Sequence, residues 1–263
     1  MRALEAASGG AVEVGSALRR ALAGPTLRDH FTASYFSLRV GMIVVAVGIP
    51  IYLALGGRFL WGLAIQDSLS AYYHADGGAL RDEFVGGLVA VGVFLILYKG
   101  FTRYENAALN VAGFAVIGVA FVPMAWQCGG ACSRASDFHG LFAYTFFAFI
   151  FYVAFFRSSD TLTPELLPDP ATRTRYHRIY RGVSIAMAGA ILLAGAIAFF
   201  AHRQQIVIVL ESVGVWAFAA YWIVKSDEMR RSDAGKWLAE GRLAPGASGR
   251  RELFQQSPVE VVP

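Results

Sequence analysis

Six long apolar runs dominate this sequence and leave few folds open to it. An apolar helix needs about 20 residues to cross the hydrocarbon core of a bilayer, and each run is close to that length. The runs lack the strict alternation of apolar and polar residues that is typical of membrane barrel strands. The sequence therefore predicts an all-α fold, a polytopic membrane protein with a bundle of about six transmembrane helices. The six predicted spans are residues 35–57, 84–100, 107–126, 138–156, 179–201 and 206–224.

The composition agrees with a membrane location and suggests a simple domain organisation. Charged residues make up 16% of the chain, whereas soluble domains usually contain about 25%. The first run begins too far into the chain, and is too long, to be a cleavable signal peptide. We expect a lead-in of residues 1–34, a transmembrane domain of residues 35–225, and a partly disordered tail of residues 226–263.

Basic residues are distributed unevenly between the two ends of the predicted bundle. With six spans, 19 of the 23 Lys and Arg residues lie on the same side as the termini, and the other four are Arg58, Arg81, Arg134 and Arg203. Because basic loops are retained in the cytoplasm, both termini are predicted to be cytoplasmic in a multi-pass protein of the cell membrane. These loops also explain the sequence pI of about 9.2. We therefore expect the lipid bilayer as a partner, and no nucleic acid.

Two cysteines lie between the third and fourth runs, in the sequence CGGAC. This loop is predicted to be non-cytoplasmic, and disulfides persist in oxidising compartments. We expect a disulfide between Cys128 and Cys132, which the two intervening glycines would allow. The alternative is a pair of free thiols.

The polar segment 67–83, DSLSAYYHADGGALRDE, separates the first two runs and is predicted to be non-cytoplasmic. Other ionisable residues are expected at the same depth of the bundle. Asp137 precedes the fourth run, His139 begins it, His202 ends the fifth, and Glu211 lies inside the sixth. The predicted topology therefore gathers histidines and carboxylates from separate helices at one end of the bundle.

Histidines and carboxylates from several helices are suited to holding zinc, which takes tetrahedral nitrogen and oxygen ligands. We expect His74, His139 and His202 as metal ligands, with Asp82 as a further ligand or base. Bound zinc would activate a water molecule at neutral pH. The alternative is that these residues are interfacial polar groups and helix caps, since negative charge is favoured at helix N-termini.

Neighbouring polar residues have predicted roles around that metal. Ser70 is expected to stabilise an oxyanion, and Tyr72, Tyr73 and Asp137 to contact the substrate, with Asp137 also orienting a histidine ligand. Glu211 is the one carboxylate deep inside an apolar run, IVIVLESVGVWAF. An ionisable residue at such a place is by default a functional hypothesis, and we expect it in the catalytic set. The alternative interpretation is that Glu211 forms a buried structural ion pair with an arginine.

Small residues recur every four positions along the fifth run. This spacing is typical of closely packed membrane helices. It predicts either packing within the bundle or a homo-oligomer interface. The residues are Gly182, Ala186, Ala190, Ala194 and Ala198.

The stretch SLSAYYH, residues 68–74, resembles the Ser-x-x-x-His element of the progestin and adipoQ receptors and the alkaline ceramidases. That resemblance implies a zinc-dependent site for lipid amides, in which Ser70 and His74 match the motif and an aspartate and two histidines complete it. The sixth run departs from that superfamily, because it has Glu211 where a His-x-x-x-His pair is expected. The stretches SLSAYYH, RDEFVGG, ENAALNVAG and ESVGVWAFAAYWIVK also resemble a bacterial six-span family, which implies the topology of an inner-membrane protein and no function.

The leading functional hypothesis is a metal-dependent membrane hydrolase of a lipid amide or ester, with its site open to the non-cytoplasmic side. A second hypothesis is an ion or proton channel or transporter that uses Glu211 and the outer histidines and aspartates, because intramembrane carboxylates often mark such paths. A third is a non-catalytic, receptor-like module that presents its polar outer loop to a ligand.

Overall fold

The structure, a computed structural model, describes residues 27–125, 137–200, 205–232 and 234. The chain divides into two compact units, Met1–Phe36 and Ser37–Pro263. In the first unit the described part is the start of helix α2 (Leu27–Ile51), up to Phe36. The second unit holds every other described element. Cys128, Cys132 and His202, together with most of the predicted lead-in and tail, lie outside the described residues.

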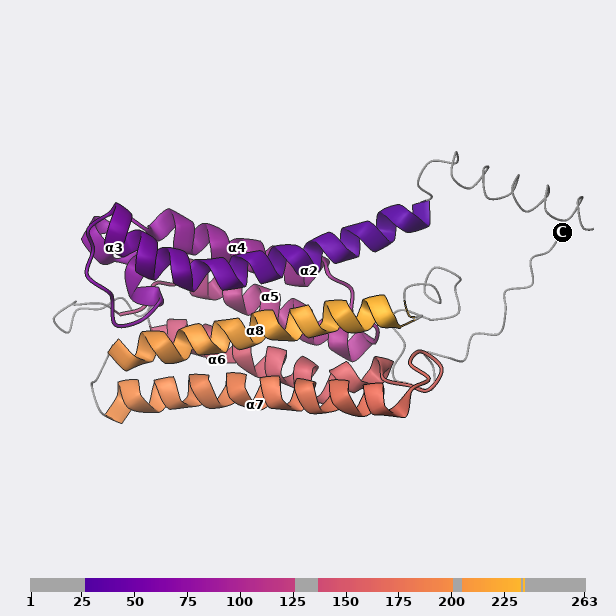
Figure 1. Cartoon of the computed structure of the whole chain (residues 1–263). Coiled ribbons are helices and arrows are strands. Elements are labelled where there is room, and N and C mark those ends of the chain that lie inside the picture. The colour runs from indigo at the N-terminus through magenta and orange to yellow at the C-terminus, as the bar shows by residue number, and fades with distance from the viewer. Residues whose placement is uncertain (1–26, 126–136, 201–204, 233, 235–263) are drawn as a thin grey trace, which may run out of the picture. The chain divides into compact units, whose positions relative to one another are not determined.

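The second unit is built from helices, and no strand occurs among the residues that the structure describes (Figure 1). This confirms the predicted all-α class. After α2 come a π-helix η1 (Tyr52–Gly56), α3 (Gly57–Leu60), two 3-10 turns, η2 (Ser70–Tyr73) and η3 (Ala75–Gly77), α4 (Arg81–Leu97), α5 (Arg103–Phe121), α6 (Asp137–Tyr152), a π-helix η5 (Val153–Arg157), a 3-10 turn η6 (Ser158–Thr161), α7 (Pro170–Phe200) and α8 (Gln205–Arg231).

Five helical stretches are long and apolar enough to cross a membrane, which supports a polytopic membrane protein. They are Thr32–Leu60, Arg103–Phe121, Phe138–Thr161, Pro170–Phe200 and Gln205–Arg231. The remaining predicted span, 84–100, corresponds to α4, which has 17 residues and falls at the lower limit of about 17 for a spanning helix. Six spans, and the side on which the termini lie, therefore stay predictions.

Neighbours in the chain pack against each other, as short connections favour. Helices α7 and α8 lie side by side along most of their length, and α5 packs against both α4 and α6 (Figure 1). The α4–α5 contact brings the two backbones together. A Cβ placed on Gly92 would lie 2.7 Å from the carbonyl oxygen of Gly113, and one on Gly113 would lie 2.7 Å from that of Gly92. Only glycines permit so close an approach.

Local sequence signals explain where several helices start and bend. Asp169 precedes α7, and its carboxylate accepts hydrogen bonds from the backbone N–H groups of Ala171 and Thr172. The hydrogen bonds from Thr172 and Ala171 lower the pKa of Asp169, and Pro170 suits the first position of the helix. Pro50 lies two residues before the start of the π-helix η1, as expected where proline removes a helical hydrogen bond.

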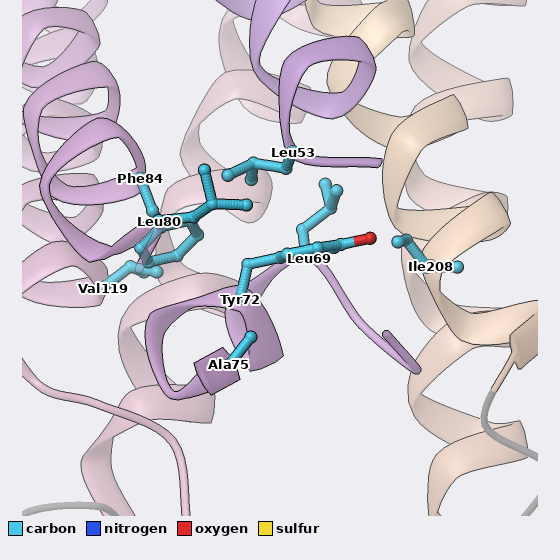
Figure 2. Close-up of a cluster of buried hydrophobic side chains, with 8 residues drawn as sticks. All are labelled: Leu53, Leu69, Tyr72, Ala75, Leu80, Phe84, Val119 and Ile208. Carbon is cyan, nitrogen blue, oxygen red and sulfur yellow. The ribbon is translucent and has the colours of Figure 1, made fainter. Parts of the chain in front are cut away.

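The polar segment folds back into the bundle, where its apolar side chains form a buried core (Figure 2). Tyr72 is 0% exposed, and its hydroxyl points toward α8, which carries Ile208 (Figure 2). The core anchors the turn η2 and thereby fixes Ser70, its first residue. The cluster consists of Leu53, Leu69, Tyr72, Ala75, Leu80, Phe84, Val119 and Ile208.

We predict that Gly92→Ala destabilises the protein, whereas Gly86→Ala does not. A methyl group on Gly92 would lie 2.5 Å from the Ile117 side chain and 2.7 Å from a backbone carbonyl, while one on Gly86, in the same helix, would meet nothing within 4 Å. Overpacking of this kind costs about 1–3 kcal/mol. Thermal unfolding of both variants in detergent tests the difference. Equal Tm values would contradict the backbone contact between α4 and α5.

Candidate functional site

Ser70 and His139 meet in the structure, although 69 positions separate them in the chain. The Ser70 hydroxyl Oγ lies 3.0 Å from Nε2 of His139. Ser70 comes from the turn η2, and His139 comes from the first turn of α6. A serine hydroxyl within hydrogen-bond reach of an imidazole is the arrangement of an activated nucleophile and its base.

The hydrogen bond of the other imidazole nitrogen, Nδ1, determines which nitrogen of His139 carries the proton. His139 Nδ1 lies 2.6 Å from the carbonyl oxygen of Val122, and a carbonyl oxygen can only accept a hydrogen bond. In the neutral ring Nδ1 therefore carries the proton and Nε2 accepts from the Ser70 hydroxyl. Val122 follows the last residue of α5, where backbone carbonyls lack helical partners, so the end of that helix orients the histidine.

Glu211 joins the same site from α8. Its Oε2 accepts a hydrogen bond of 2.7 Å from the backbone N–H of Leu69, the residue just before Ser70. One turn earlier, the backbone N–H of Ile208 donates to the carbonyl oxygen of Asp67 over 3.0 Å. These two bonds tie the serine-bearing segment to α8.

Ser70, His139 and Glu211 line one cavity of about 230 Å³. The rest of its described wall is mainly apolar and comes from α2 and from α4 to α8, and no lysine or arginine occurs among the described lining residues. Apolar pockets with a few convergent polar groups are typical ligand sites. The arrangement is suited to binding an apolar chain with its polar end beside Ser70. Residues that line the deeper part include Ala46, Val91, Val116, Phe146 and Phe218.

Other residues of the predicted site lie around this cavity without lining it. His74 places Nε2 3.1 Å from the carbonyl oxygen of Met124. Tyr73 packs edge-on against His74 and lies under the Arg81 guanidinium. Tyr72 is part of the core, where burial raises the pKa of its hydroxyl, and that hydroxyl accepts a bond from the backbone of Gln66. Asp82 is exposed at the start of α4.

The described donors do not fit the predicted zinc site. No group of three His, Cys, Asp or Glu residues that could hold a metal occurs in the described part of the chain. Both nitrogens of His139 are engaged by Val122 and Ser70, so a metal at Nε2 would have to displace the serine. The proposed roles of His202 and of the Asp137 side chain concern groups outside the described set, and they stay predictions.

The small residues of the predicted fifth span divide between two environments. Ala190 and Ala194 are buried and lie on the face of α7 that meets the bundle interior. Gly182, Ala186 and Ala198 are exposed. The structure thus shows packing within the bundle at the middle of this row, and a homo-oligomer through the fifth span stays a prediction.

The sequence did not reveal a second polar cluster, the ionic network, at the opposite end of the bundle. The Lys225 ammonium lies 3.1 Å from the Glu228 carboxylate and 2.7 Å from the Thr161 hydroxyl. Thr161 and Tyr180 both donate to Glu228, and Lys225 and Glu228 are 1% and 0% exposed. Lys225 was interpreted as one of the basic residues that define topology.

A smaller group of charged residues lies at the same end of the bundle. Arg157 forms an ion pair of 2.7 Å with Asp160 and donates to the Thr102 hydroxyl over 3.0 Å. Thr102 also caps α5 by accepting from the N–H of Glu105, whose carboxylate accepts from Phe101. The spacing Thr-x-x-Glu resembles a capping box. In the sequence, the available signal for both groups is a pair of oppositely charged residues three positions apart at the end of an apolar run, Arg157 with Asp160 and Lys225 with Glu228.

No family model, no curated protein and no solved structure matches this chain. The function is therefore inferred from the geometry described above.

We predict that Glu228→Gln lowers stability strongly, whereas the neighbouring Asp227→Asn does not. Removing one partner of a buried ion pair typically costs about 3–5 kcal/mol. Asp227 pairs with Arg231 at the surface, where the two side chains are 39% and 62% exposed, and such pairs contribute about 0–1 kcal/mol. Asp227 also accepts from the Tyr176 hydroxyl, and the amide oxygen of Asn can accept the same bond. Chemical unfolding in mixed micelles measures both. Similar losses in the two variants would contradict the tight burial of the ionic network.

Proposed function

We propose that this protein is a membrane-embedded serine hydrolase that cleaves an ester or amide of an acyl chain. The observation that carries the proposal is the hydrogen bond between Ser70 and His139 at the polar end of an apolar cavity. Such a pair can perform acyl transfer through a covalent intermediate. The proposal keeps the substrate class expected from the sequence and replaces zinc with a serine nucleophile.

The proposed reaction begins with attack by Ser70 Oγ on the carbonyl carbon of the substrate. The serine proton passes to Nε2 of His139, and the resulting imidazolium is stabilised by its Nδ1–H bond to the Val122 carbonyl. When the carbon–oxygen or carbon–nitrogen bond to the leaving group breaks, His139 returns that proton to the leaving atom. Water, activated by His139 in the same way, then hydrolyses the acyl-serine ester and restores the free hydroxyl.

Glu211 is proposed to act in its neutral form as a donor to the developing oxyanion. A carboxylate charge is costly in a cavity whose described lining residues include no lysine or arginine. Its Oε2 already accepts from Leu69, which leaves the Oε1 hydroxyl to donate into the cavity. Donors that are held in position before the reaction stabilise such charge strongly.

The apolar wall is proposed to hold the acyl chain, and the site to open on the non-cytoplasmic side. The distribution of Lys and Arg supports this orientation. Apart from Glu211 and His139, the described lining residues include no Asp, Glu, Lys, Arg or His, which favours an uncharged chain over a polar ligand.

An ion or proton path is the second candidate function. Helix α8 carries Glu211 near one end and Lys225 and Glu228 near the other, and intramembrane ionisable residues often line such paths. The buried aromatic rings of Phe218 and Trp222 lie between these groups on the same helix. Flux into liposomes tests this candidate, and the absence of flux in the wild type would eliminate it.

We predict that Ser70→Ala and His139→Ala abolish hydrolysis of acyl esters by the protein in nanodiscs. Loss of a positioned general base costs about 10²–10⁴-fold in rate, and loss of the nucleophile costs at least as much. Ser212→Ala is the matched control, because that buried hydroxyl donates to the carbonyl of Ile208 within its own helix. Wild-type rates in Ser70→Ala would refute the serine mechanism, and metal chelation is expected to leave the wild-type rate unchanged.

Substitutions at Glu211 test whether its side chain acts as a hydrogen-bond donor or as a charged group. Glu211→Gln keeps a hydrogen-bond donor of nearly the same shape and should retain activity within about tenfold, while Glu211→Leu should lose about 10²–10³-fold, as when an oxyanion donor is removed. The rate constant of single-turnover acylation reports on this step. Equal loss in both variants would show that the carboxylate itself is required.

A further inference from the structure

We infer that the substrate of the proposed hydrolase is a bilayer lipid whose acyl chain enters sideways, through a portal between α6 and α7. This inference rests on the proposed function for its chemistry. Its structural basis is separate, because it depends on where the cavity reaches the surface. The portal is framed by Tyr144 on α6 and by Gly195 and Ala198 on α7.

The cavity extends from the bundle interior to the gap between these two helices. On α7 its wall passes from the buried residues Ile191 and Ala194 to the half-buried Gly195 and the exposed Ala198. On α6 the lining residue Tyr144 is 46% exposed. Helices α6 and α7 also pack together less extensively than α7 and α8. At this position the wall between the two helices is therefore formed by the Tyr144 side chain.

The absence of a side chain at Gly195 makes room for the Tyr144 side chain, which crosses the gap between α6 and α7. A Cβ on Gly195 would overlap the Tyr144 hydroxyl and lie 3.0 Å from its ring carbon. The phenol thus lies directly against the α7 backbone. The contact depends on the absence of a side chain at 195, and rotation of the Tyr144 ring would widen the portal.

The surroundings of the portal identify what can enter it. Both helices belong to stretches that are apolar and long enough to span a membrane, and their outward side chains are large and apolar. Leu141 on α6 and Leu192 and Phe199 on α7 are 59%, 65% and 75% exposed. Such a surface faces lipid chains, so the portal opens into hydrocarbon.

The portal lies at a depth from which the ester carbonyl group of a lipid can reach Ser70. Tyr144 follows His139 by five residues on α6, which places it about 8 Å deeper along the helix at 1.5 Å per residue. An acyl chain that enters at Tyr144 can extend toward Val91 and Phe218 while its carbonyl group reaches Ser70. A water-soluble short ester would reach Ser70 from the polar-loop end and would not need the portal.

Gly195→Leu should close the portal, and Gly189→Leu is its matched control. Gly189 lies on the same helix, and a Cβ there would meet nothing within 4 Å. In liposomes we expect Gly195→Leu to lower turnover of a long-chain phospholipid ester by at least about tenfold, because the acyl group is displaced from the nucleophile. Turnover of p-nitrophenyl acetate should fall by much less than lipid turnover, because a short ester can reach Ser70 from the polar-loop end. Adding Tyr144→Ala should restore lipid turnover.

A second readout does not require catalysis. Phosphatidylcholine with a diazirine in its acyl chain is photolysed in vesicles that contain the protein, and adducts are mapped by mass spectrometry. The wild type and Gly189→Leu should be labelled at cavity residues of α6 and α7, and Gly195→Leu should lose that labelling. Equal labelling in all three proteins overturns the portal. If neither ester is hydrolysed by the wild type, the proposed function fails, and labelling still decides the portal.

Discussion

The serine-bearing segment can lie inside a helical bundle because its backbone groups find hydrogen-bond partners there. A non-helical backbone at membrane depth is tolerated only where protein or water satisfies its N–H and C=O groups. Helix α8 supplies two of these bonds, through the Glu211 carboxyl to Leu69 and through the N–H of Ile208 to Asp67. The turns η2 and η3 satisfy others within the segment. The position of Ser70, and with it the site, depends on this attachment.

The two ends of α8 have different physical roles. At one end Glu211 faces a cavity whose described lining residues include no lysine or arginine. At the other, Lys225 and Glu228 neutralise each other in a buried network with Thr161 and Tyr180. A satisfied ion pair fixes the helix against its neighbours, whereas the Glu211 carboxyl group, which accepts from Leu69 through Oε2, has a second oxygen that can interact with a ligand. The protein therefore separates the charges that hold the bundle together from the polar groups that are proposed to act.

Much of the fold could be predicted from hydrophobic patterning, because a run of about 20 apolar residues has few alternatives to a helix in a bilayer. The topology alone predicted that Asp82, His139 and Glu211 gather at one end of the bundle. In the structure His139 and Glu211 lie at the cavity with Ser70, and Asp82 is exposed at the start of α4. The Ser70–His139 pair could not be predicted, since it depends on how the 3-10 turn η2 packs and on the carbonyl of Val122. The zinc prediction rests on counting donors, and it stays a prediction because His202 lies outside the described residues. No sequence signal indicates that both nitrogens of His139 are engaged by Val122 and Ser70. The ionic network was missed because Lys225 looked like a topology signal.

The central claim is that Ser70 is a nucleophile activated by His139 within a membrane bundle. Covalent labelling of the intact protein in nanodiscs by a fluorophosphonate tests it most directly, because this reagent forms a stable phosphonyl ester with an activated serine. Intact mass and peptide mapping should show one adduct per chain, located on Ser70, with labelling greatly slowed in His139→Ala. A folded protein that remains unlabelled, or that carries the adduct on another serine, would contradict the claim.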